Sequence, residues 1–355
     1  MITDYRQYLV DRFINDKTIA KYVFGANAVT RQVAQKVAGI IGVIDEYTKN
    51  DTFEGIPIVH RLEDIDKEAY ILNCVYSAHA VTAQIRLEKY FVNTIDVFSL
   101  IKFSGINVNI EHYSGFDNYY RDNQKAFDEI FERLSDEESK TIFQRLVDFR
   151  LNHNLSALNT FKYDLEGQYF EPFLKLKEEG ETFVDVGGYD GYTSLQFIRH
   201  CPQYRKIFLL EPGANFMEEA KDSLAQYKNI EYFTIAASEE KGELFFNLNA
   251  SCSSISDQGT IRIQADKIDN LVKGDVSYIK MDVEGSEVSA IAGAVETIRR
   301  CHPRLAISIY HNPNDYISIP QQILNICDDY KLYVRHYTEG VNDSVMYFVP
   351  TSIID

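Results

Sequence analysis

Apolar and polar positions follow three different patterns along this chain. Up to residue 104, short runs rich in β-branched and aromatic residues, such as IIGVIDEY at 40–47 and YILNCVYS at 70–77, alternate with segments whose apolar residues recur every three or four positions. Strands that alternate with helices form parallel sheets. We therefore expect residues 1–104 to form a small α/β domain.

Residues 105–177 show a mostly helical pattern. The segments 121–134 and 135–153 place apolar residues three or four positions apart, as amphipathic helices do. Ser135 precedes a run of acidic residues, so we expect it to cap the second of these helices at its N-terminus. This zone is predicted to be a helical connector.

Strand and helix patterns return over residues 178–355. Seven runs have the composition of strands, at residues 182–187, 206–212, 230–236, 276–282, 304–310, 331–337 and 344–350. Only the turn TEGVND separates the last two, so the final strand is expected to run antiparallel and to close the sheet. The prediction is an α/β protein with two domains and a helical connector.

Composition narrows the range of partners. The formal net charge is −17 and no long lysine or arginine run occurs, which argues against a nucleic-acid or anionic-membrane partner. No apolar stretch approaches the roughly 18 residues of a membrane span, so we expect a cytoplasmic protein without leader or membrane insertion. Scattered cysteines are typical of reduced thiols; they are Cys74, Cys201, Cys252, Cys301 and Cys327.

The segment DVGGYDG lies between a predicted strand and a predicted helix, the setting of nucleotide-binding loops. Its acidic residues Asp185 and Asp190, with Glu211 one strand later, disfavour a phosphate and favour a cationic ligand that carries hydroxyl groups. S-adenosylmethionine has both properties, and Glu211 could accept hydrogen bonds from its two ribose hydroxyls. The alternative is a glycine turn that binds nothing. The glycines are Gly187, Gly188 and Gly191.

Two further strand ends carry polar residues. Asp282 ends the predicted strand 276–282 and is followed by Glu284, while Tyr310 and His311 end the next strand. Ligands of open α/β sheets gather at the carboxyl ends of the strands. We therefore expect Asp185, Glu211 and these side chains to share one crevice.

These segments resemble the FkbM family of S-adenosylmethionine-dependent O-methyltransferases. The likeness lies in DVGGYDG, LEP at 210–212, IKMDVEGSE at 279–287 and SIYH at 308–311, and it covers roughly residues 168–350. One departure is Tyr189, where many relatives have asparagine. The resemblance implies a seven-stranded Rossmann-like methyltransferase domain over 178–355 and S-adenosylmethionine as cofactor. The implied cofactor-binding residues are Asp185, Gly187, Gly188, Tyr189, Asp190, Gly191, Glu211, Pro212 and Asp282.

Methyl transfer from a sulfonium requires mainly that the acceptor oxygen be held in line with the methyl group. The candidates for a base are His311, Asp282 and Glu284, and His311 is preferred because an ordinary histidine titrates near neutral pH. No metal is required, although Asp282 and Glu284 could hold a divalent ion. The predicted reaction methylates a hydroxyl of a saccharide or a sugar-containing metabolite.

The N-terminal zone contains part of a dinucleotide fingerprint. Gly25 follows a strand and Asp45 comes 20 positions later, but Asn27 and Thr30 occupy the other glycine places. With GIPIVH at 55–60 the segment resembles small Rossmann-like domains of bacterial sugar acyltransferases, which implies nucleotide-sugar binding or a packing and oligomerisation role. Two alternatives for the whole protein stay open: a nucleotide-sugar-binding protein with an inactive methyltransferase domain, and an NAD(P)-dependent sugar oxidoreductase or epimerase.

Overall fold

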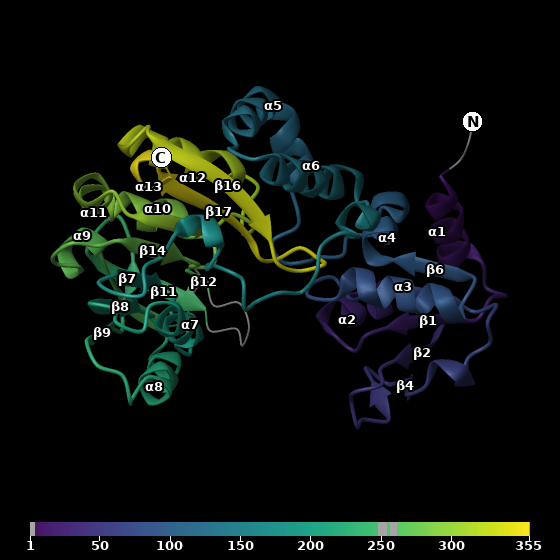
Figure 1. Cartoon of the computed structure of the whole chain (residues 1–355). Helices are drawn as coiled ribbons and strands as arrows, with labels where there is room; N and C mark the ends of the chain where they lie inside the picture. The colour runs from purple at the N-terminus through teal and green to yellow at the C-terminus, as the bar shows by residue number, and fades with distance from the viewer. Residues whose placement is uncertain (1–3, 248–253, 256–260, 355) are drawn as a thin grey trace. The chain divides into compact units, whose positions relative to one another are not determined.

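The computed structural model describes residues 4–247, 254–255 and 261–354 (Figure 1). The chain forms two compact units. The first unit contains residues 1–118, 143–163 and 337–342, and the second contains residues 119–142, 164–336 and 343–355. No described helix is long and apolar enough to cross a membrane.

The first unit is built on a six-stranded sheet in the order β3-β4-β2-β1-β5-β6. All neighbours are parallel except β3 and β4, so the parallel α/β fold predicted for this zone is confirmed. Its strands are β1 (Lys21–Phe24), β2 (Ile40–Ile44), β3 (Thr52–Phe53), β4 (Ile56–Val59), β5 (Tyr70–Asn73) and β6 (Asn93–Asp96). Its first helices are α1 (Tyr5–Asn15), α2 (Ala28–Lys36), η1 (Leu62–Asp64), α3 (Ala80–Tyr90) and α4 (Val97–Ser104).

The predicted helical zone contains α5 (Phe116–Arg133), α6 (Glu137–Asn152) and the short helices η2 (Leu155–Leu158) and η3 (Pro172–Leu174). Its residues are divided between the two units. Ser135 does not cap α6. Instead, Asp136 Oδ1 accepts a hydrogen bond from Ser139 N at 2.7 Å, while Ser135 N and Oγ bond the backbone of Leu332. The helix therefore begins one residue later than the sequence suggested, because Ser135 pairs with a strand distant in sequence.

The second unit is built on a seven-stranded sheet in the order β16-β17-β15-β14-β7-β8-β9. Its strands are β7 (Thr182–Val186), β8 (Lys206–Leu210), β9 (Ile230–Phe233), β14 (Tyr278–Met281), β15 (Arg304–Ser308), β16 (Tyr330–His336) and β17 (Ser344–Pro350), and each coincides with a predicted run. The last strand is antiparallel, as predicted, but it lies between β15 and β16 and not at the edge. The helices are α7 (Tyr192–His200), α8 (Ala214–Ser223), α9 (Ile268–Leu271), α10 (Glu287–Ala292), α11 (Val295–Cys301), α12 (Asp315–Ile326) and α13 (Thr351–Ile354).

A second, four-stranded sheet in this unit was not predicted. It has the order β10-β13-β11-β12, with β10 (Ala236–Ala237), β11 (Gly242–Asn247), β12 (Ser254–Ile255) and β13 (Ile261–Asp266). Its buried core is small, made of Ala236, Ile263 and Ala265 with Leu244 packed against them. So few apolar positions give only a weak alternating pattern, which is why the strands were missed.

The cysteines of the described part of the chain are free thiols: Cys74, Cys201, Cys301 and Cys327. This agrees with the reduced state expected from their spacing. Cys252, the fifth cysteine of that prediction, lies outside the described residues.

Candidate active site

The glycine loop between β7 and α7 touches neighbouring strands closely. Gly187 has φ +77°, and a Cβ there would lie 1.9 Å from the carbonyl oxygen of Asp282. A Cβ at Gly188 would lie 2.5 Å from the Leu209 side chain. The first two glycines are therefore required by packing at the strand ends, in addition to any approach of a ligand.

Asp185 lies beneath this loop and is fully buried. Its Oδ2 accepts a hydrogen bond from Ser194 Oγ at 2.8 Å, and its Oδ1 lies 3.3 Å from Lys280 Nζ. Lys280 in turn donates to the carbonyl oxygen of Gly187 at 2.6 Å. This buried ion pair fixes the loop from below, so Asp185 supports the loop and does not face the ligand space expected for it.

Glu211 follows β8 and faces the same loop. Its Oε2 accepts a hydrogen bond from Tyr189 N at 3.1 Å and its Oε1 accepts one from Gly213 N at 2.7 Å. Burial raises the pKa of this carboxyl, although the two backbone N–H groups oppose the shift. An ionised carboxylate offers about four acceptor sites, so two remain for ligand hydroxyls.

A cavity of about 490 Å³ opens at the carboxyl ends of β7, β8 and β14. This size lies within the usual range of small-molecule sites. It is lined by eight of the predicted site residues: Gly187, Gly188, Tyr189, Asp190, Glu211, Pro212, Asp282 and Glu284. Its apolar wall contains Phe216, Ile235, Ala236 and Ala237. Three predicted residues are not among its lining residues: Asp185, Gly191 and His311.

Tyr189 has a left-handed backbone, with φ +45°. Asparagine tolerates this conformation better than tyrosine, which gives a physical reason for the asparagine expected at this position. Here the tyrosine ring packs against Phe216, with the ring centroids 4.3 Å apart. The departure from the family pattern therefore adds an aromatic contact at the wall of the cavity.

Tyr169 also lines the cavity, and the sequence did not mark it as a site residue. Its hydroxyl donates to Asp282 Oδ2 at 2.9 Å and lies 3.2 Å from Ser308 Oγ. Its backbone has φ +72°, and its N–H donates to the Tyr347 hydroxyl at 3.0 Å. A strained, buried tyrosine thus fixes one oxygen of Asp282. Its sequence signal was its place at the start of residues 168–350, the range over which the chain resembles the family.

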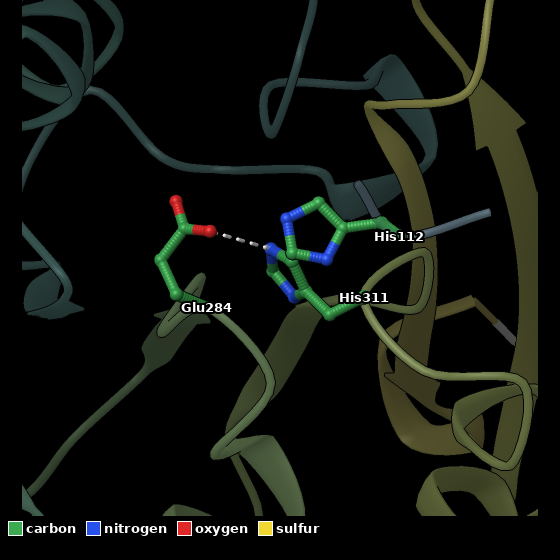
Figure 2. A group of neighbouring side chains, drawn as sticks. All are labelled: His112, Glu284 and His311. Atoms are coloured by element: carbon green, nitrogen blue, oxygen red, sulfur yellow. Dashed lines mark ion pairs between the residues drawn. The ribbon is translucent and has the colours of Figure 1, made fainter. Parts of the chain in front are cut away.

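His311 follows β15, and its side chain is fully buried. Its Nδ1 lies 2.9 Å from Glu287 Oε1, and its Nε2 lies 3.5 Å from Asp282 Oδ1 and 3.6 Å from Glu284 Oε2. Figure 2 shows the contact with Glu284 as a dashed line; the third labelled residue, His112, belongs to the other compact unit. Three carboxylates of one unit therefore surround a single imidazole.

This environment changes the charge of the imidazole. Burial by itself lowers the pKa of His311, but Glu287, Asp282 and Glu284 together raise it to about 10. The ring is therefore an imidazolium at neutral pH, without a lone pair for a proton, and it does not line the cavity. A buried, protonated ring is disfavoured as a base, whereas the other two candidates, Asp282 and Glu284, line the cavity.

The two remaining candidates differ in their surroundings. Burial raises the pKa of Asp282, but Lys280 and His311 outweigh burial and hold it below the usual range. Glu284 has φ +53° and is followed by Gly285 with φ +94°, a tight turn that directs the chain past the cavity. The Glu284 side chain is 30% exposed, whereas that of Asp282 is 23% exposed and is held by the Tyr169 hydroxyl. It is the more accessible carboxylate for a bound acceptor.

Asp282, Glu287 and His311 offer ligand atoms that all lie within 4.8 Å of one another, close enough to surround one metal ion. This set differs from the pair Asp282 and Glu284 that the sequence suggested for a metal. A metal would need a neutral imidazole, whereas the ion pair at 2.9 Å and the raised pKa of His311 favour the protonated ring. The geometry therefore favours a network of ion pairs.

In the first unit, the side chains of the candidate nucleotide-binding residues Asn27 and Asp45 accept hydrogen bonds from backbone N–H groups of nearby residues. Asn27 Oδ1 caps α2 by accepting from Val29 N at 2.9 Å and Thr30 N at 3.0 Å. Asp45 Oδ2 accepts from Ala26 N at 3.0 Å. The cavity described for this unit, of about 630 Å³, is lined by other residues, among them Arg6 and Asp96. These contacts give Asn27 and Asp45 a structural role in the loop.

A seven-stranded sheet with an antiparallel strand inserted next to the edge, and a glycine loop after its central strand, defines the Rossmann-like methyltransferase fold. Residues 185–331 match the family model described as the methyltransferase FkbM domain. The fold of the whole chain is similar to that of the methyltransferase FkbM from Methylobacillus flagellatus KT, with a TM-score of 0.78, 21% identity, and coverage of 98% of this chain and 94% of that one.

Weaker similarities are confined to about half of the chain. An rRNA methylase from Streptococcus thermophilus matches with a TM-score of 0.35 and 12% identity over 50% of this chain and 92% of that one. Aeropyrum pernix fibrillarin, in complex with S-adenosyl-L-methionine, matches with a TM-score of 0.34 and 15% identity over 52% of this chain and 71% of that one. No curated protein sequence matches the chain.

These comparisons confirm the predicted fold, and they support a methyltransferase domain of the FkbM type over residues 185–331. They do not support the resemblance of the N-terminal zone to sugar acyltransferases. The similarity to the Methylobacillus flagellatus structure covers nearly the whole chain, the N-terminal zone included.

Proposed function

We propose that this protein transfers a methyl group from S-adenosylmethionine to a hydroxyl of a saccharide or a sugar-containing metabolite. The observation that carries the proposal is the position of Glu211: a buried carboxylate with spare acceptor sites, bonded to the glycine loop at the mouth of a cavity of about 490 Å³. The cofactor would supply an electrophilic methyl group on a positively charged sulfur. The residues present fit such a ligand in size, polarity and charge.

The lining residues divide into three groups by chemistry. Glu211 would accept hydrogen bonds from ribose hydroxyls, and the apolar wall around Phe216 and Ala236 would cover a flat base. Asp282, held ionised by its neighbours, would balance positive charge. Glu284, the more exposed carboxylate, would accept the proton of the acceptor hydroxyl.

The proposal of a sugar acceptor is supported by the polar groups on the remaining wall. Gln168 and Asp343 line the cavity, and Gln168 Nε2 donates to Asp343 Oδ1 at 3.2 Å. With Glu284 they give the cavity wall two carboxyl groups and one amide. Such groups suit a ligand with several hydroxyls better than an apolar acceptor.

Two measurements test this function. Calorimetric titration of the full-length protein with S-adenosylhomocysteine tests cofactor binding, with Glu211→Ala as the perturbed variant and Glu218→Ala, an exposed residue of α8, as the matched control. Mass spectrometry of reactions with S-adenosylmethionine and a panel of sugars, glycolipid headgroups and nucleotide sugars tests transfer. We expect binding that only Glu211→Ala weakens, and a mass increase of one methyl group on a sugar.

Three other outcomes would each contradict a different part of the proposed function. No binding of S-adenosylhomocysteine would refute the cofactor assignment. Binding without transfer to any hydroxyl compound would favour the alternative of an inactive methyltransferase domain. Tight binding of NAD by the first unit would favour the oxidoreductase alternative, against the occupied hydrogen-bonding groups of Asn27 and Asp45.

A further inference from the structure

Glu287 is a buried carboxylate near the candidate active site that is not among the residues lining the cavity. It begins α10, and its side chain has no exposed surface. Its Oε1 accepts a hydrogen bond from Val283 N at 2.9 Å and lies 2.9 Å from His311 Nδ1. One carboxylate oxygen thus holds both the backbone between Asp282 and Glu284 and the imidazole that faces them.

The contacts of His311 continue this arrangement. Its Nε2, on the opposite side of the ring from Glu287, lies 3.5 Å from Asp282 Oδ1 and 3.6 Å from Glu284 Oε2. The ring packs against Tyr310, with the centroids 4.0 Å apart, which restricts its rotation. The order in space is Glu287, then His311, then the two carboxylates that line the cavity.

The surrounding charges explain why a buried cation is needed here. Besides the three carboxylates in contact, Asp315 and Asp343 also interact with His311. Lys280 is a second cation close to Asp282, but it is paired with Asp185. Removing charged groups from water without a counter-charge is costly. A fixed imidazolium offsets the mutual repulsion of Asp282 and Glu284.

We propose that Glu287 and His311 form a buried ion pair that keeps Asp282 and Glu284 ionised and directed at the cavity. Glu287 and His311 are then positioning residues for methyl transfer. The inference rests on the proposed function for its catalytic consequence, but the state of the ion pair itself does not depend on any ligand. Loss of the Glu287 charge would let His311 lose its proton roughly two pH units lower than in the wild type. Asp282 and Glu284 would then repel each other without a cation between them.

The test uses the full-length protein labelled with ¹⁵N-histidine. The imidazole nitrogens are followed by NMR between pH 6 and 9, and the His311 signals are identified by their absence in His311→Gln. We expect a doubly protonated His311 ring across this range in the wild type. In Glu287→Gln the midpoint should fall by roughly two pH units, in line with the loss of one close opposite charge. Glu287→Asp should restore part of the shift, and Glu296→Gln, on the exposed first turn of α11, should leave it unchanged.

The catalytic consequence is measured on the same variants. In Glu287→Gln we expect kcat to fall roughly 10–100-fold and the acidic limb of the kcat–pH profile to shift to higher pH. The affinity for S-adenosylhomocysteine should stay within about threefold of the wild-type value. A neutral His311 at pH 7 in the wild type would refute the proposal. Perturbation of its signals by millimolar Mg²⁺ or Mn²⁺ would also refute it and assign a metal site instead.

The two proposals fail in different ways. If the wild type binds no S-adenosylhomocysteine and methylates nothing, the proposed function is wrong, while the NMR titration still decides whether the ion pair exists. If Glu287→Gln does not fold, the wild-type titration and Glu287→Asp still decide the protonation of His311. Unchanged kcat in a folded Glu287→Gln variant with a shifted His311 midpoint would refute the positioning role alone.

Discussion

Replacing Gly187 by alanine tests whether the glycine loop is fixed by strand packing. Gly187 and Gly180 have nearly the same backbone, with φ +77° and φ +81°, but their surroundings differ. A Cβ at Gly187 would lie 1.9 Å from the Asp282 carbonyl oxygen, whereas a Cβ at Gly180 would meet nothing within 4 Å. Gly180→Ala is therefore a matched control that shares the backbone strain and lacks the collision.

The backbone strain and the collision together set the expected loss of stability. A left-handed alanine costs about 1–2 kcal/mol, partly offset by about 0.4–1 kcal/mol from the stiffer unfolded chain, so Gly180→Ala should lower the free energy of unfolding by about 1 kcal/mol. At Gly187 the oxygen must also retreat by roughly 1 Å, and overpacking of this kind adds about 1–3 kcal/mol. Because Asp282 would move with its carbonyl, S-adenosylhomocysteine should bind at least about tenfold more weakly to Gly187→Ala.

The protein has no tryptophan, so unfolding is best followed by far-ultraviolet circular dichroism. The two units can melt separately; the relevant transition is the one that S-adenosylhomocysteine shifts to higher temperature. At about 2–4 °C per kcal/mol, Gly187→Ala should melt several degrees below Gly180→Ala. Equal melting temperatures and equal ligand affinities for the two variants would show that the loop is not packed against Asp282 as described.

Three further outcomes are expected. Glu211→Ala should weaken S-adenosylhomocysteine binding about ten- to a hundredfold, since charge-assisted hydrogen bonds are lost; an unchanged calorimetric titration would contradict the assignment. The pKa of His311 is raised from 6.5 to about 10 on folding, so its stabilising contribution is full below pH 6.5 and is lost as pH rises through 10. The wild type should melt at a higher temperature than His311→Gln, and this difference should shrink between pH 6.5 and 10. A difference that grows over this range would contradict the raised pKa of His311. Tyr169→Phe should lower kcat by about tenfold and the melting temperature by several degrees, because Asp282 loses one buried donor while the ring stays in place; a loss of stability with normal kcat would make the hydroxyl purely structural.

The sequence by itself predicted the elements whose signals are local. All seven strands of the larger sheet of the second unit were visible as short apolar runs, and the glycine loop and Glu211 followed from their places at strand ends. The resemblance to the FkbM family added the cofactor and most of the residues that line the cavity. These features depend on the pattern within a few residues, or on the rule that the strand ends of a parallel sheet meet at one edge.

Only the tertiary structure decided which way each charged group turns and what faces it. Asp185 ends a strand as expected, yet its pairing with Lys280 places it beneath the loop. His311 lies at the expected strand end, yet three carboxylates from the segment 282–287 surround its imidazole, raise its pKa and disfavour it as a base. The insertion of β17 between β15 and β16 likewise depends on strand pairing between segments distant in sequence. Protonation and strand order are set by such long-range contacts, which no local pattern of residues encodes.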